Sequence, residues 1–110
     1  MVSVEIELAK INDWESFHEC FAIAMGFPKF YGKNMNAWED CMLDISRPTT
    51  QGMTRVAVPQ GEDLVLILSD ASEFLEQHME IFTALLNSTA NVNRAKISIP
   101  GASKILLLLV

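Results

Sequence analysis

The chain has 110 residues, half of them hydrophobic, and its formal net charge at pH 7 is −6. This length suits one domain spanning residues 1–110, and the high apolar content excludes a disordered chain. The negative charge argues against nucleic-acid binding, because phosphates would repel the protein. It favours a basic partner, although acidity of this kind also serves solubility alone.

The sequence shows no membrane or metal-binding pattern. No apolar run approaches the ~20 residues of a membrane-spanning helix, and the N-terminus lacks a signal-peptide pattern. Cys20 and Cys41 have neither C-x-x-C nor metal-ligand spacing, so we expect reduced, packed thiols, no metal and no cofactor. We therefore expect a cytoplasmic monomer with no membrane contact.

The residues that could perform catalysis do not form a recognisable set. A Cys41–His78 pair is conceivable, but nothing in the sequence places the two side chains together. No strand is followed by a Gly-rich phosphate loop, so nucleotide binding is unsupported. We expect no enzymatic activity and assign no catalytic residue.

Residues 2–8 alternate strictly between apolar and polar and predict a half-exposed edge strand. Asn12 is the expected N-cap of the next helix, Glu15 completes a possible capping box, and Gly26 ends the helix. We expect His18 on its solvent side. The face expected to be buried comprises Trp14, Phe17, Phe21, Ile23 and Ala24.

Residues 27–33 form an aromatic loop around Pro28 and Gly32, and Gly32 is expected to allow a backbone shape that a side chain would forbid. Asn34 then caps a helix that runs to Ile45. The helix positions expected to point inward are Met35, Trp38, Met42 and Ile45. The polar stripe, with residues four apart, comprises Asn36, Asp40 and Asp44.

The second half of the chain predicts two more strands. Residues 46–63 are rich in Pro, Gly, Thr and Gln and are interpreted as a loop, long enough to be functional. Residues 64–68 form an apolar run that fits a strand covered on both faces. Ser72 can cap a helix running to about Arg94, and residues 104–110 form the last, fully apolar strand. The order β-α-α-loop-β-α-β predicts an α/β fold with a small parallel sheet.

Residues 27–42 read Phe-Pro-Lys-Phe-Tyr-Gly-Lys-Asn-Met-Asn-Ala-Trp-Glu-Asp-Cys-Met. This run resembles the signature of the barstar family, roughly Leu-Pro-x-Tyr-Tyr-Gly-x-Asn-Leu-Asp-Ala-Leu-x-Asp-Cys-Leu. The positions that match it outright are Pro28, Tyr31, Gly32, Asn34, Ala37, Asp40 and Cys41. The resemblance implies a three-stranded parallel sheet with helices packed on it, in agreement with the predicted order of elements.

The resemblance also implies an intracellular inhibitor, an immunity protein or antitoxin, of a basic, secreted, barnase-type ribonuclease. Asp40 matches the family's principal acid, which enters the nuclease site where the RNA phosphate would bind. The aromatic loop would cover the base-binding region. Phe30 stands at an aromatic position that is often Tyr, and Gly32 and Asn34 match residues that shape or contact the partner.

Several positions depart from the family pattern. Asn36 stands where a second Asp is usual, and Glu39 stands where a contacting Trp can occur. A further acid of the last helix falls near Asn87, which is neutral, while Asp44 is an additional acid on the same stripe and could partly compensate. The alternative is a barstar-like interaction module whose partner is a divergent toxin or not a nuclease, reached through Asp44, Glu39 and the long loop.

Overall fold

The structure is a computed structural model that describes residues 1–46 and 53–110. Three strands, β1 (Val2–Glu7), β2 (Leu64–Ser69) and β3 (Ile105–Leu109), form a parallel sheet in the order β1-β2-β3. The predicted α/β fold and the edge position of the first strand are confirmed. The helices are α1 (Trp14–Met25), α2 (Met35–Leu43), α3 (Ala71–Gln77) and α4 (Met79–Lys96), with a short 3-10 helix η1 (Leu8–Lys10) after β1.

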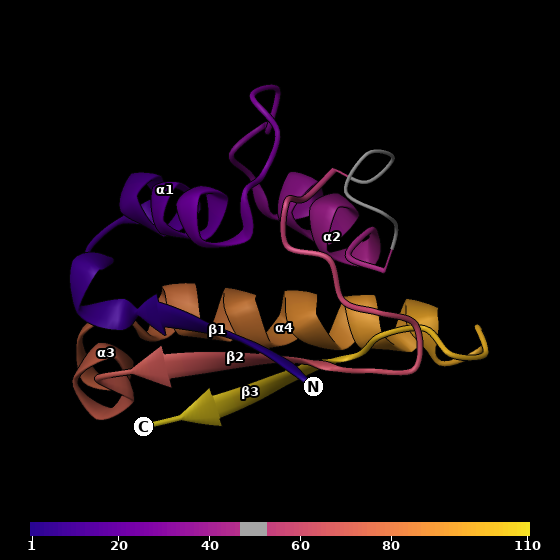
Figure 1. Cartoon of the computed structure of the whole chain (residues 1–110). Coiled ribbons are helices and arrows are strands. Elements are labelled where there is room, and N and C mark those ends of the chain that lie inside the picture. Colours follow the sequence, from indigo (N-terminus) through magenta and orange to yellow (C-terminus); the bar gives the residue numbers. More distant parts are fainter. Residues whose placement is uncertain (47–52) are drawn as a thin grey trace.

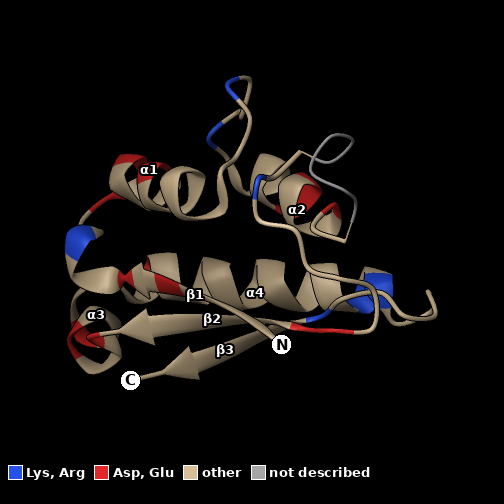
Figure 2. Cartoon of the chain, in the orientation of Figure 1, with Lys and Arg blue, Asp and Glu red and all other residues tan. Residues whose placement is uncertain are grey.

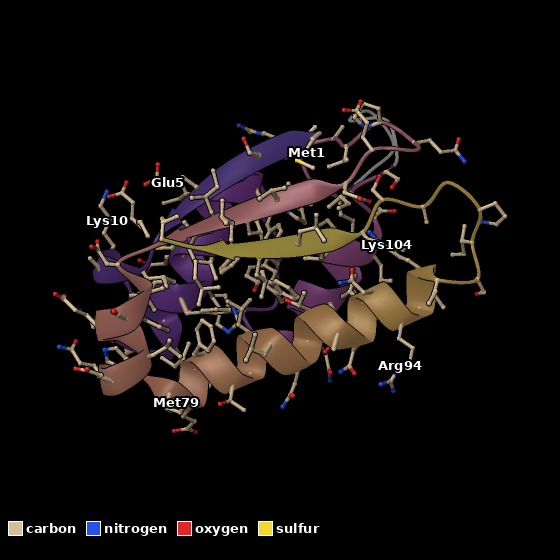
Figure 3. All side chains as sticks on the ribbon, turned by 90° about the horizontal axis from the view of Figure 1, so that it is seen from below. Met1, Glu5, Lys10, Met79, Arg94 and Lys104 are labelled. Atoms are coloured by element: carbon tan, nitrogen blue, oxygen red, sulfur yellow. The ribbon has the colours of Figure 1, made fainter. Side chains whose placement is uncertain are left out.

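The helices cover one face of the sheet (Figure 1). The side chains on that face are buried along all three strands: Ile6, Leu64, Leu66, Leu68 and Ile105. On the opposite face, Ser3 and Glu5 of β1 are exposed and Leu106 of β3 is half-exposed, while on the central strand β2 Val65 is 9% exposed and Ile67 half-buried between their neighbours. Figure 3 shows the sheet from below with no helix in front of it. The prediction that β2 is covered on both faces is therefore wrong for this open face.

Helix α1 begins one residue later than expected. Asp13, not Asn12, is the N-cap, and its side chain accepts a hydrogen bond from the Ser16 N–H in a capping box. Phe17, Phe21 and Met25, four residues apart, form the buried face. Of the expected core residues, Ile23 is on the opposite side of the helix and is 84% exposed. Trp14 is on the buried side, where its ring packs against Phe17 and His18, but its place in the first turn leaves it 37% exposed.

The predicted helix 72–94 is two helices, α3 and α4, which break at His78 (φ −137°). The left-handed residue Asp70 precedes α3, so Ser72 lies inside the helix and is not its cap. The Asn87-Ser88-Thr89 stretch does not interrupt α4, because Ser88 and Thr89 are buried against the rest of the protein. None of the described helices has the length and apolar content to span a bilayer.

Residues 53–63 contain no helix or strand, as the loop prediction requires, and residues 47–52 of that loop lie outside the described residues. Arg55 N–H donates to the Gly26 carbonyl at 3.0 Å, and Val58 N–H donates to the Ile45 carbonyl at 2.8 Å. These bonds hold the segment against the ends of α1 and α2. Gly26 has φ +68°, and a Cβ added there would lie 2.5 Å from the Cβ of Arg55.

Gly26→Ala is expected to lower the free energy of unfolding by more than the roughly 1–2 kcal/mol of left-handed strain, because the methyl group also overlaps Arg55. Gly61→Ala is the matched control: Gly61 has φ +88° and nothing within 4 Å of an added Cβ. Urea unfolding of both variants measures the difference. Equal losses would show that the Gly26–Arg55 contact is not tight.

Candidate functional site

The aromatic loop, residues 27–33, is pinned from inside by Tyr31. The Tyr31 hydroxyl forms a buried hydrogen bond with Nδ1 of His18 on α1. The Tyr31 ring lies 4.7 Å from that of Phe27, and its N–H donates to the Pro28 carbonyl at 3.0 Å. The expectation that His18 faces solvent is wrong: the side chain is 4% exposed, because the loop folds over it.

The outer side of the loop presents a ring between two cations. Phe30 is 77% exposed, and Lys29 and Lys33 on either side of it are exposed as well. Figure 2 shows the two lysines as the blue parts of the loop between α1 and α2, above the red acids of α2. Neither ammonium group has a hydrogen bond or ion pair within the described part of the chain. Sequence reasoning missed this local charge because it considered the net charge of the whole chain.

Gly32 does not have the special backbone that was predicted for it. The glycines with positive φ among the described residues are Gly26, Gly61 and Gly101, and the strained position in this loop is Lys33, with φ 54°. A Cβ at Gly32 would meet the Asn34 Nδ2 at 3.4 Å and the Ala37 Cβ at 3.5 Å. The missing side chain instead leaves space open between the loop and α2.

Helix α2 begins after the predicted cap, Asn34, and ends at Leu43, two residues before the predicted end at Ile45. The Asn34 Oδ1 accepts a hydrogen bond from the Ala37 N–H at 2.8 Å and caps the helix. Trp38 and Met42 are fully buried, while Asn36 and Asp40 are exposed one turn apart on the other face. Among the described residues, the Asp40 carboxylate has no hydrogen bond or ion pair.

The loop and α2 enclose a hollow of about 210 Å³. It is lined by Pro28, Phe30, Tyr31, Gly32, Ala37, Asp40, Cys41 and Met53. The structure thus brings together three predicted site residues, Phe30, Gly32 and Asp40. Met53, a lining residue that sequence reasoning missed, comes from the long loop and carried no local signal.

Cys41 lies at this hollow as a weak nucleophile. Burial, and then the nearby charges of Asp40 and Asp44, raise the pKa of the Cys41 thiol to about 11. His78, its conceivable catalytic partner, lines a different pocket, beside Ile11 and Phe74. No cluster of three or more potential metal ligands occurs among the described residues.

Two acids of the predicted site are engaged within the chain. The Glu39 Oε2 accepts hydrogen bonds from the Ser88 Oγ at 2.8 Å and the Asn91 Nδ2 at 3.3 Å, which joins α2 to α4. The Asp44 Oδ2 accepts a hydrogen bond from the Met53 N–H at 2.8 Å. Asn87 is exposed on α4, one turn before Asn91. Glu39 and Asp44 thus differ from Asp40, whose carboxylate has no such bond among the described residues, while their role toward a partner stays a prediction.

Comparison with known families decides the identity of this fold. The family model described as Barstar (barnase inhibitor) matches residues 1–98. The chain belongs to the barstar family. No curated protein matches the chain. Barstar-family proteins are generally ribonuclease inhibitors and not enzymes.

The buried His18 makes the stability of the loop depend on pH. Burial, and then the nearby Lys33 charge, lower the pKa of the His18 imidazole below its ordinary value of 6.5. Near that pH the unfolded chain binds more protons than the folded one, so this contribution to stability is complete above pH 6.5 and is lost as pH falls through the folded-state pKa.

We therefore expect the free energy of unfolding to fall between neutral and mildly acidic pH. Urea unfolding across this range measures the loss. In a variant with both His18→Phe and Tyr31→Phe, the dependence should shrink, since the buried imidazole and its hydrogen-bond partner are both gone. An unchanged pH dependence in that variant would assign the effect to other groups.

Proposed function

We propose that this barstar-family protein inhibits a basic, barnase-type ribonuclease by inserting Asp40 into its active site and covering the site with the aromatic loop. The observation that supports this most directly is the exposed carboxylate of Asp40, which has no hydrogen bond or ion pair among the described residues, beside the exposed ring of Phe30. A ribonuclease must bind the anionic phosphate of RNA with cationic side chains. A carboxylate in the same place would accept charge-assisted hydrogen bonds from them.

The fixed shape of the surface adds to the proposal. Tyr31 is held by His18, and Asn34 caps α2. Phe30 and Asp40 are therefore positioned before any partner arrives. Pre-organised side chains lose less conformational entropy on binding than side chains ordered during it.

The other predicted contacts fall into two groups. Gly32, Asn34 and Asn36 are exposed beside Asp40 and Phe30 and would contact the nuclease directly. Asn87 would contact it from the exposed side of α4. Glu39 and Asp44 accept hydrogen bonds from α4 and from Met53, so in this proposal they chiefly hold α2 in place.

Asp40→Ala is expected to weaken inhibition of a barnase-type ribonuclease by about 2–5 kcal/mol, because it leaves the cationic groups of the nuclease site buried without a partner. Titration of ribonuclease activity with wild type and variant gives the two inhibition constants. Salt should slow association of the wild type. Equal inhibition by both proteins would rule out the proposed role of Asp40.

Two further variants serve as controls for this experiment. Glu76→Ala on α3 changes the net charge by the same amount at an exposed residue outside the hollow, and it should leave inhibition nearly unchanged. Asp40→Asn should lose inhibition without losing stability, because an acid near the C-terminal end of a helix opposes the helix dipole.

A second candidate is an interaction module whose partner is a divergent toxin or not a nuclease. The observation that favours it is the charge of the surface: Lys29 and Lys33 flank Phe30, and Asn36 is neutral. Such a surface fits a partner with acidic groups opposite the loop. A pull-down of the native partner, followed by a ribonuclease assay, separates the candidates. A captured protein without nuclease activity, together with no effect on a barnase-type ribonuclease, would favour the second.

A cytoplasmic location follows from the first candidate. An inhibitor of a secreted ribonuclease protects the cell that makes the enzyme only if it acts before export. Such a protein would be an immunity protein or antitoxin. Inhibitor and nuclease recovered together from the cytoplasmic fraction of a producing cell would support this, and an inhibitor found outside the cell would contradict it.

A further inference from the structure

The two edges of the sheet differ in their protection against pairing. β1 carries Glu5 and Glu7 on the open face, and charged side chains on an edge strand discourage the addition of another strand. β3 has no charged residue. Leu106, Leu108 and Leu109 are 43%, 50% and 44% exposed. An edge strand with exposed apolar side chains is a typical place for strand addition.

Hydrogen bonds show which backbone groups of β3 point away from the sheet. The Lys104 carbonyl accepts a hydrogen bond from the Leu64 N–H, and the Val110 N–H donates to the Leu68 carbonyl. The N–H and C=O of even-numbered residues therefore face β2. Those of Ile105, Leu107 and Leu109 face outward, because successive residues of a strand alternate.

Asn93 of α4 already binds the outward-facing groups of Ile105, the first of these three residues. Its side-chain amide accepts a hydrogen bond from the Ile105 N–H at 2.8 Å and donates one to the Ile105 carbonyl at 2.9 Å. The outward N–H and C=O groups of Leu107 and Leu109 have no hydrogen-bond partner within the described residues. The open part of the edge is thus restricted to two residues.

We propose that the protein forms a two-fold symmetric dimer in which β3 pairs antiparallel with β3 of a second copy, in the register that places Leu108 opposite Leu108. In this register Leu107 of each copy lies opposite Leu109 of the other. Each such pair exchanges two N–H···O=C bonds. All four open groups of each copy are then satisfied by the same four groups of the other.

We assign a second copy as the partner of the β3 edge because its four open N–H and C=O groups match those of the first copy in this register. In the register that places Leu107 opposite Leu107, Leu109 would face Ile105, whose groups Asn93 already binds. That register leaves Leu109 unpaired, so Asn93 selects the register centred on Leu108. β3 brings no charged side chain to the interface, and on the open face Leu108 packs on its equivalent while Leu106 packs on Val110 of the second copy.

The proposed dimer leaves the candidate inhibitory surface, which consists of the aromatic loop (residues 27–33) and α2, accessible to a partner. Figure 1 shows β3 at the border of the sheet opposite the aromatic loop and α2. Each copy could therefore bind a partner while β3 is paired. The proposal does not depend on the nature of that partner, and it differs from the monomer expected from the sequence.

Leu108→Cys tests the register directly. Directly opposed residues in a non-hydrogen-bonded antiparallel pair have Cα atoms about 4.5 Å apart, which is within the range of a disulfide. Leu106→Cys is the matched control, because its two copies would lie about 13 Å apart along the strands. Both are made in a Cys20→Ser background, since Cys20 is the less buried native thiol. After mild oxidation, non-reducing mass analysis should find a disulfide-linked dimer for Leu108→Cys only.

Sedimentation of the wild-type chain over a range of concentrations gives the second readout. We expect reversible dimers that Leu108→Lys converts to monomers, because the two-fold axis would bring like charges together. Ile23→Lys, at an 84% exposed apolar residue of α1, should leave the dimer intact. Circular dichroism establishes that each variant is folded. A wild type that is monomeric at every concentration, or equal cross-linking of both cysteine variants, would overturn the proposal.

Discussion

The buried hydrogen bond between Tyr31 and His18 determines where the candidate inhibitory surface stands. It joins the aromatic loop to α1 through a side chain that neither sheet nor helix would otherwise fix. On one side of Tyr31 the loop leaves α1 at Gly26, and on the other it enters α2 at Asn34. A loop of this length without the Tyr31 anchor could place Phe30 in many positions. With it, the ring of Phe30 and the carboxylate of Asp40 border the same hollow.

The acids around this surface differ in whether the chain itself binds them. Glu39 binds Ser88 and Asn91 across α2 and α4, and Asp44 binds the Met53 N–H where the chain returns from the long loop. These bonds hold α2 against α4 and against the segment at Met53. Asp40 has no such partner among the described residues, although it lies between them in the sequence. The Asp40 carboxylate can therefore accept the hydrogen bonds that the proposed inhibition requires of it.

The sequence predicted those features that depend on neighbouring residues. The alternation in residues 2–8, the Asn34 cap and the inward face with Trp38 and Met42 are local patterns, and the structure has all three. Features that depend on distant contacts were missed. His18 is buried because Tyr31 folds over it, and Glu39 is engaged because α4 supplies Ser88.

The open face and the open β3 edge were missed for a related reason. An apolar run such as residues 105–110 has the same pattern whether one or both faces of its strand are covered. Only the placement of the helices over one face decides this. The side-chain amide of Asn93, which closes part of the edge, comes from another element and leaves no mark near residue 105.

The distribution of charge along α2 is opposite to what helix stability alone would favour. Asn36 lies in the first turn, where a carboxylate would be stabilised by the helix dipole, and it is neutral. Asp40 lies toward the C-terminal end, where the dipole opposes an acid and no basic residue of the last turn compensates. The helix dipole therefore gives no reason for an acid at position 40. In the proposed complex, a cationic group of the nuclease would convert this unfavourable charge into a favourable one.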